Sequence, residues 1–143
     1  EITTRLVGSE MCIRDSSLSW VEYLPACMLR SPFSCVEPER QEEYDLLIYV
    51  ANWPIPRRLA WDALLRARAL ENQCYVCGVN RTGMDGYHLK YNGGSKIYSA
   101  FGEEIASLPD EQEGIATTSL QLGALNRLRE KFPVWKDADE FHL

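Results

Sequence analysis

A segment that reads as strand, helix and strand constrains the fold of this 143-residue chain more than any other feature. Residues 44–51 are an almost continuous apolar run of strand length, and residues 74–79 form a second such run. Such runs are typical of parallel strands that are buried on both faces of a sheet. Pro54 and Pro56 precede a helical pattern over residues 57–73, and proline is tolerated in the first turn of a helix. The segment therefore predicts a right-handed βαβ unit and an α/β fold.

Polar and aromatic side chains follow both predicted strands. Asn52 and Trp53 come after the first strand, and Asn80 and Arg81 come after the second. Ligands of open α/β sheets bind outside the carboxyl ends of the strands, so these four residues are our candidates for a substrate pocket. For Trp53, a position in the core is an open alternative, because most aromatic side chains are buried.

The predicted helix carries an apolar stripe at three- and four-residue spacing, which consists of Ala60, Ala63, Leu64, Ala67 and Leu70. Glu71 falls on this stripe and in the last helical turn, where the helix dipole disfavours an anion. A carboxylate in such a position needs a specific partner. We therefore expect Glu71 to be a buried, hydrogen-bonded structural support, and a direct role in an active site is the alternative.

The rest of the chain predicts further short strands and one more helix. The expected order is a polar loop (84–94), a hairpin (95–100 and 104–108), an acidic loop (109–113), a short strand (114–118), a helix capped by Thr118 or Ser119 that runs to about Lys131, and a tail (134–143). Trp135 and Phe141 lie among acidic residues in this tail, and such a tail is expected to pack on a neighbour or on a second subunit.

Cys74 and Cys77 have the spacing of a metal or redox motif. Residues three apart on a strand point to opposite faces, however, so the two sulfurs could not bind one ion. Only His88 and His142 could add nitrogen ligands, and His88 lies in a loop that we expect to be solvated. We predict two core thiols and no metal site. Cys27 and Cys35 lack a nearby base that would activate a nucleophile.

Composition bounds the class of protein. The length fits one domain or part of a larger one, and the net charge of −6 argues against a nucleic-acid or anionic-membrane partner. No apolar run approaches the length of a membrane span, and the first residues do not resemble a signal peptide. We expect a cytoplasmic protein with reduced cysteines.

Several different motifs follow one another between Gln41 and Phe141. They are Tyr44–Pro54, Arg66–Gln73, Gly78–Gly83, Gly94–Ile97, Phe101–Glu103 and Arg129–Pro133. Together they resemble the carbon–nitrogen hydrolase (nitrilase) superfamily, and Ala51–Pro54 and Phe132–Asp137 resemble its omega-amidase branch. The resemblance implies an α/β fold that is part of a four-layer αββα sandwich, with residues 41–143 as the C-terminal part and the N-terminal half missing. It also implies a homodimer that needs no cofactor.

The resemblance further implies a Cys–Glu–Lys triad that hydrolyses a small linear amide through a thioester. The family's Glu and Lys lie upstream of the matching segment, and Glu71 matches a different Glu of the family, so no catalytic residue is assigned. We expect a full-length parent that converts a 2-oxo acid amide to the 2-oxo acid and ammonia, while this chain itself is inactive. The alternatives are another amidase, nitrilase or carbamoylase of the superfamily, or a non-catalytic α/β interaction module in which Trp135 and Phe141 dock a partner.

The first forty residues do not fit the resemblance. Residues 1–16 resemble a translated sequencing adaptor, with a disordered tail as the alternative. The family's nucleophile block should precede Tyr44, and codons compatible with Met28–Arg40 give that block when they are read one base later. We therefore predict a frame-shifted segment over residues 17–40, in which the codon of the nucleophilic Cys overlaps Met28 and Leu29.

Overall fold

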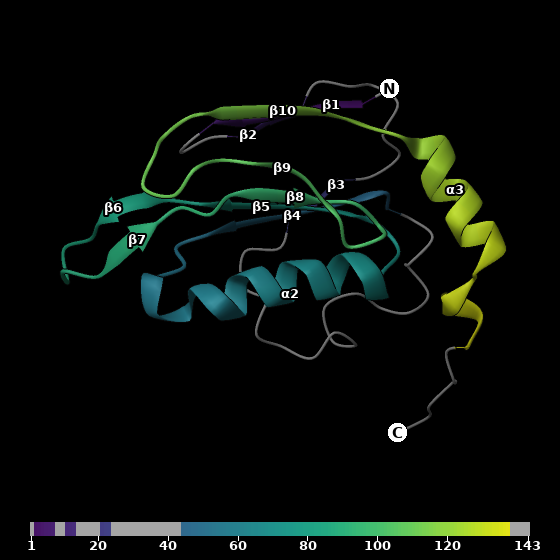
Figure 1. Ribbon diagram of the computed structural model, residues 1–143, viewed down its shortest axis with the longest axis horizontal. Coiled ribbons are helices and arrows are strands. Elements are labelled where there is room, and N and C mark those ends of the chain that lie inside the picture. The colour runs from purple at the N-terminus through teal and green to yellow at the C-terminus, as the bar shows by residue number, and fades with distance from the viewer. Residues whose placement is uncertain (1, 8–10, 14–20, 24–43, 138–143) are drawn as a thin grey trace.

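The computed structural model describes residues 2–7, 11–13, 21–23 and 44–137, and Figure 1 shows their arrangement. In chain order the elements are β1 (Ile2–Val7), β2 (Met11–Ile13), β3 (Val21–Tyr23), β4 (Leu46–Ala51), the 3-10 helix η3 (Ile55–Arg57), α2 (Arg58–Glu71), β5 (Tyr75–Asn80), β6 (Thr82–Met84), β7 (Lys90–Asn92), β8 (Lys96–Tyr98), β9 (Glu104–Ser107), β10 (Ile115–Leu120), α3 (Leu122–Lys131) and the 3-10 helix η4 (Val134–Asp137). Within these ranges, no helix is long and apolar enough to cross a membrane.

The central sheet has five strands in the order β3-β4-β5-β8-β9. Strands β3, β4 and β5 are parallel, and β8 and β9 are antiparallel to their neighbours. Leu46 pairs with Tyr75 at one end of β4 and β5, and Ala51 pairs with Asn80 at the other. The carboxyl ends of the two strands therefore coincide at one edge of the sheet. Since α2 connects them, the predicted βαβ unit is confirmed.

Helix α2 covers one face of the central sheet, and a second sheet in the order β10-β1-β2 lies on the other side (Figure 1). The core has two parts accordingly. Trp61 and Leu65 of α2 pack with Tyr49 and Val76 on the first face. Leu120 and Leu125 pack with Ile48, Cys77 and Ile97 on the second face. The predicted α/β class is confirmed, and the two sheets with α2 form three successive layers of the predicted sandwich.

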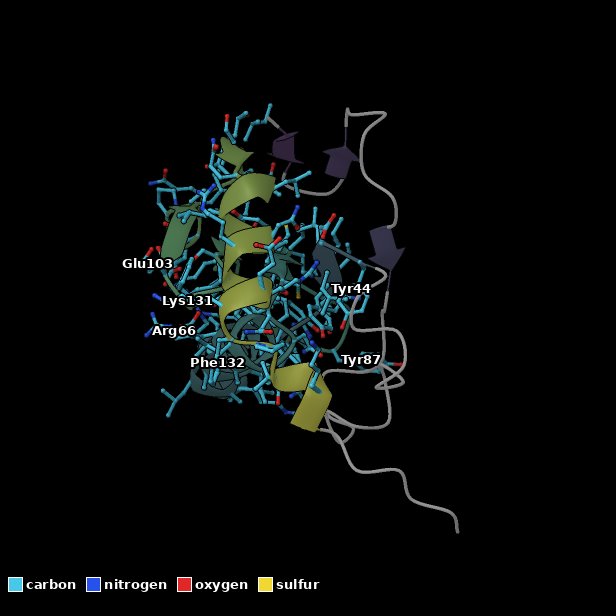
Figure 2. The ribbon with its side chains drawn as sticks, turned by 90° about the vertical axis from the view of Figure 1, so that its right-hand side faces the viewer. Tyr44, Arg66, Tyr87, Glu103, Lys131 and Phe132 are labelled. Atoms are coloured by element: carbon cyan, nitrogen blue, oxygen red, sulfur yellow. The ribbon has the colours of Figure 1, made fainter. Side chains whose placement is uncertain are left out.

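Helix α3 lies across the end of the sheets, facing the viewer in Figure 2. The guanidinium of Arg129 ties it to the βαβ unit. Arg129 donates hydrogen bonds to the carbonyl oxygens of Gln73 (3.1 Å) and Tyr44 (2.7 Å), and to Asp45 Oδ1 (2.8 Å). Because this group reaches the start of β4 and the end of α2 together, it fixes α3 against both.

The apolar stripe predicted for α2 is wrong for four of its five residues, since Ala60, Ala63, Ala67 and Leu70 are exposed. Its fifth member, Leu64, is half-buried and packs against the core. The buried residues of the helix are Trp61, Leu65, Arg68 and Ala69. Large side chains bury more apolar area than alanine, so the helix turns Trp61 and Leu65 inward. The regular spacing of the alanines had indicated the opposite face of the helix as the buried one.

The observed orientation of α2 also changes the environment expected for Glu71. Its side chain is 36% exposed and forms an ion pair with Arg68, which is buried. The expected partner is present, but the predicted burial of Glu71 is wrong. The helix also ends at Glu71, two residues earlier than expected, because Gln73 takes a positive φ of 45° and turns the chain toward β5.

Two other local predictions are wrong. The loop predicted over residues 84–94 contains most of an antiparallel hairpin, in which Thr82 pairs with Asn92 and Met84 pairs with Lys90. Strands of three residues are too short to show an alternating pattern. Thr118 and Ser119 belong to β10, which pairs with β1 over its full length, so Gln121 precedes α3 and makes no side-chain cap.

Three strands lie where the sequence showed no usable period. β1 and β2 fall within residues 1–16, and β3 falls within residues 17–40. The domain assignments of these two segments, as adaptor or tail and as frame-shifted segment, stay predictions. Cys27, Cys35 and Phe141 lie outside the described residues, and so does the side chain of Trp135.

Gly78 brings α2 close to the sheet. A Cβ atom at this position would lie 2.8 Å from Leu65 Cδ2 and 2.8 Å from Trp61 Cζ2, both of which are in the core. Such distances are too short for carbon atoms, so only glycine lets the helix approach β5 this closely.

We expect Gly78→Ala to destabilise the chain by about 1–3 kcal/mol, because the added methyl group overpacks the helix–sheet contact. Urea unfolding followed by circular dichroism measures the loss. Gly86→Ala is the matched control, since a Cβ atom there meets nothing within 4 Å, and it should change stability by less than about 0.5 kcal/mol. Equal stabilities of the two variants would contradict this account of the contact.

Candidate functional site

A half-open pocket of about 360 Å³ lies at the carboxyl ends of β4 and β5. Its apolar wall is made by Val50, Ala51 and Val79, and its polar wall by Asn52, Arg81, Thr82 and Glu113. The pocket is where the sheet topology predicts ligand binding. It contains two of the four residues that the sequence singled out, Asn52 and Arg81.

Asn80 lies behind the pocket wall, where it is 2% exposed. Its Oδ1 accepts a hydrogen bond from the backbone N–H of Trp53 (2.7 Å), and its Nδ2 donates to the carbonyl oxygens of Trp53 (2.9 Å) and Gly93 (2.8 Å). Its backbone N–H donates to the Ser95 hydroxyl (3.0 Å). One buried amide therefore joins the end of β4 to the residues before β8, and it positions the pocket from behind.

Trp53 belongs to the core. It is 8% exposed, and its ring centroid lies 5.7 Å from that of Trp61. Its indole N–H donates to the carbonyl oxygen of Arg57 (2.6 Å). Of the two alternatives left open by the sequence, the structure supports the core position, because this side chain anchors the chain between β4 and α2.

Arg81 is the half-buried cation of the pocket wall. Its guanidinium lies over the ring of Tyr91, with the Cζ atom 4.9 Å from the ring centroid. Such stacking is favourable because the negative face of the ring attracts the cation. Tyr91 comes from β7 and Arg81 directly precedes β6, so the hairpin that the sequence concealed is the platform for this arginine.

Asp85 fixes the platform. One carboxylate oxygen accepts the Tyr91 hydroxyl (2.8 Å), and the other accepts the backbone N–H groups of Tyr87 (2.9 Å) and Leu89 (3.0 Å). Desolvation alone would raise the pKa of Asp85. These hydrogen bonds, together with the charge of Arg81, outweigh it and lower that pKa. The hydrogen bond to Asp85 in turn raises the pKa of Tyr91, so the pair stays as carboxylate and neutral phenol at neutral pH.

The two described cysteines lie away from the pocket. Cys74 packs in the core under α2 and Cys77 in the core on the other face of the sheet, so the predicted opposite orientation is confirmed. Burial raises the pKa of both thiols, that of Cys77 to about 12. Neither thiol is a nucleophile at neutral pH, since the thiolate is the reactive form. In the described ranges, no three His, Cys, Asp or Glu side chains gather as a metal site would require.

The described wall can recognise a ligand, and it supplies a guanidinium, an amide, a hydroxyl and a carboxylate for that purpose. Sequence reasoning missed Thr82, Glu113, Tyr91 and Asp85. Thr82 follows Arg81 directly and could have been included with the strand end. Tyr91 and Asp85 depend on a hairpin that has no sequence period, and Glu113 reaches the pocket from an acidic loop.

We expect Asn80→Ala to cost at least about 2 kcal/mol of stability. The substitution leaves the buried N–H of Trp53 and the buried carbonyls without a partner, and each such group costs about 1–3 kcal/mol. Urea unfolding measures the effect. Asn126→Ala removes the same side chain from an exposed position of α3 and should be nearly neutral. A loss at Asn80 no larger than at Asn126 would refute the role of the amide.

Comparison with known proteins identifies the family. A family model described as carbon-nitrogen hydrolase matches residues 38–130. The chain is 52% identical over 101 residues to an omega-amidase of Escherichia coli, and this match covers 71% of the chain and 40% of the relative. It is 38% identical over 92 residues to a 2-oxoglutaramate amidase of Paenarthrobacter nicotinovorans, with 64% of the chain and 31% of the relative covered. The chain therefore spans less than half the length of these curated relatives.

The fold comparison agrees. A solved CN-hydrolase superfamily protein from Xanthomonas campestris superimposes with a TM-score of 0.78 at 36% sequence identity, and the match covers 92% of this chain and 53% of that one. A carbon–nitrogen hydrolase from Helicobacter pylori, with a TM-score of 0.65 at 18% identity, shares the fold. The predicted resemblance is confirmed: this chain belongs to the carbon–nitrogen hydrolase family.

Proposed function

We propose that the full-length parent of this chain is a cytoplasmic omega-amidase-like hydrolase that acts on the terminal amide of a short 2-oxo acid. The observation that carries the proposal is the 52% identity over 101 residues to a curated omega-amidase. The pocket supports it, because about 360 Å³ suits a small ligand. The free thiols of Cys74 and Cys77 fit a reducing compartment.

In the proposed reaction a thiol attacks the amide carbonyl, ammonia leaves, and water then releases the acid and regenerates the thiol. The pocket wall described here supplies neither that thiol nor the Lys of the expected triad. We assign this wall to substrate recognition and propose that the chain by itself is inactive.

The first test is to resequence the source DNA across the codons of residues 17–41 with its upstream flank, and to express the full reading frame. We expect a Cys codon that overlaps the codons of Met28 and Leu29 and that lies in the reading frame of the full-length protein. The full protein should release ammonia from a linear monoamide, as a coupled ammonia assay measures. The 143-residue chain is the control and should release none. A full protein that is folded but inactive on every linear amide would refute the proposed function.

We also propose that the parent is a homodimer and that the outer face of α2 lies in its interface. Ala63 and Ala67 are exposed on this face, and Leu70 beside them is 48% exposed. Phe101 is 55% exposed, and it precedes Gly102, where a Cβ atom would lie 3.1 Å from Leu70 Cγ. An exposed apolar patch of this kind is typical of an interaction surface.

Ala67→Glu should convert the full-length dimer to monomer, because it places a charge in an apolar contact. Sedimentation velocity measures the change. Asn126→Glu introduces the same side chain at an exposed position of α3 and should leave the dimer intact. A full-length protein that sediments as a monomer before mutation, or a dimer that Ala67→Glu leaves unchanged, would contradict the assignment.

A further inference from the structure

We propose that Arg81 is the specificity-determining residue of the pocket and that it binds the carboxylate of an anionic amide substrate. The inference rests on the proposed function, since it names the substrate class of the same site. It assigns the anionic end of the substrate to the carboxyl end of β5.

The geometry of the stack leaves Arg81 ready to bind. Its Cζ atom lies over the ring of Tyr91, 4.9 Å from the ring centroid, and a guanidinium presents its N–H donors as a rigid planar fork. The Nε group makes a long hydrogen bond of 3.5 Å to the carbonyl oxygen of Thr82. Neither terminal nitrogen has a hydrogen-bond acceptor or an ion-pair partner among the described residues. Two donors in this fork match the two oxygens of a carboxylate.

Glu113 shares the pocket wall but does not neutralise Arg81 in this structure. Its side chain is exposed, and no ion pair joins the two residues within the described part of the chain. A hydrated carboxylate keeps its charge at little cost, so it can remain near the cation without occupying it. Its negative charge should nevertheless weaken the binding of an anion, and this effect gives a second variant with the opposite sign.

The hairpin holds Arg81 in place for this role. Tyr91 is 8% exposed, and its hydroxyl is bound to Asp85, which also binds two backbone N–H groups of the loop. The ring under the guanidinium is therefore fixed at both ends. A pre-organised arginine loses less side-chain entropy when it binds a ligand than a free one does. Tyr91 is a positioning residue, because it acts through Arg81.

The test compares two probes of equal length that differ in charge. Glutaramate has one amide and one carboxylate, whereas glutaramide has two amides. We would titrate each into the isotope-labelled 143-residue chain and follow the backbone N–H signals of Asn52, Arg81 and Thr82 by nuclear magnetic resonance. We expect shifts that saturate with glutaramate and much weaker shifts with glutaramide.

The variants assign the effect to the guanidinium. Arg81→Met should raise the apparent Kd for glutaramate at least tenfold, and Tyr91→Leu should raise it less. Tyr91→Phe should raise it least, since the ring remains and only its hydrogen bond to Asp85 is lost. Glu113→Gln should lower it. Arg127→Met removes the same charge from an exposed position of α3 and should leave it unchanged. The dispersion of the spectrum shows whether each variant is folded. If Arg81→Met does not fold, Arg81→Lys takes its place, because lysine keeps the charge but lacks the planar fork of donors.

Equal shifts with the two probes would overturn the proposal. So would the absence of a shift at Arg81 when the glutaramate concentration is raised to 50-fold above a Kd of about 1 mM. So would an equal effect of Arg127→Met. Kinetics on the full-length enzyme separate this result from the proposed function, because Arg81→Met should reduce kcat/KM for glutaramate far more than for glutaramide. A full-length protein that hydrolyses neither amide would refute the amidase proposal, and the binding titration would still decide the role of Arg81.

Discussion

One buried amide determines how the ends of β4 and β5 meet. Parallel strands pair along their length through their own backbone groups, but beyond β4 the chain has no strand partner in the part that the structure describes. Asn80 takes that place, since its side chain pairs with both backbone groups of Trp53 as a neighbouring strand would. The same amide binds Gly93, so the residues before β8 are fixed too. An amide can do this because it offers a donor and an acceptor side by side, which neither Asp nor Leu does.

The pocket follows from this constraint and from the close packing behind it. Gly78 lets α2 lie against β5, and Trp61 of α2 donates a hydrogen bond to the carbonyl oxygen of Gly94 (2.8 Å). Trp53 packs on Trp61 in the core. The backbone at the strand ends therefore has little freedom, and the side chains that face the pocket are held by a rigid base. Arg81 gains its position from a different source, the hairpin, which lies outside the core.

This division explains what could be predicted from the sequence. The βαβ unit and its strand ends were predictable, because two buried runs joined by a helix of that length allow few topologies. The face of α2 was not, since regular alanine spacing suggested a stripe while Trp61 and Leu65 decided the rotation by their size. The hairpin was not predictable either, because its stability comes from Asp85 and from the stack of Arg81 on Tyr91. Both features depend on contacts between residues that sequence periodicity does not relate.

The proposed role of Arg81 would separate substrate recognition from bond breaking along the chain. Residues that bind the far end of a linear substrate need a fixed position and a suitable charge, and β5 with its hairpin provides both for Arg81. Residues that break the bond must surround the carbonyl carbon at the other end of the substrate, away from Arg81. In the proposed enzyme, binding energy at Arg81 would then orient an amide whose chemistry occurs at that other end.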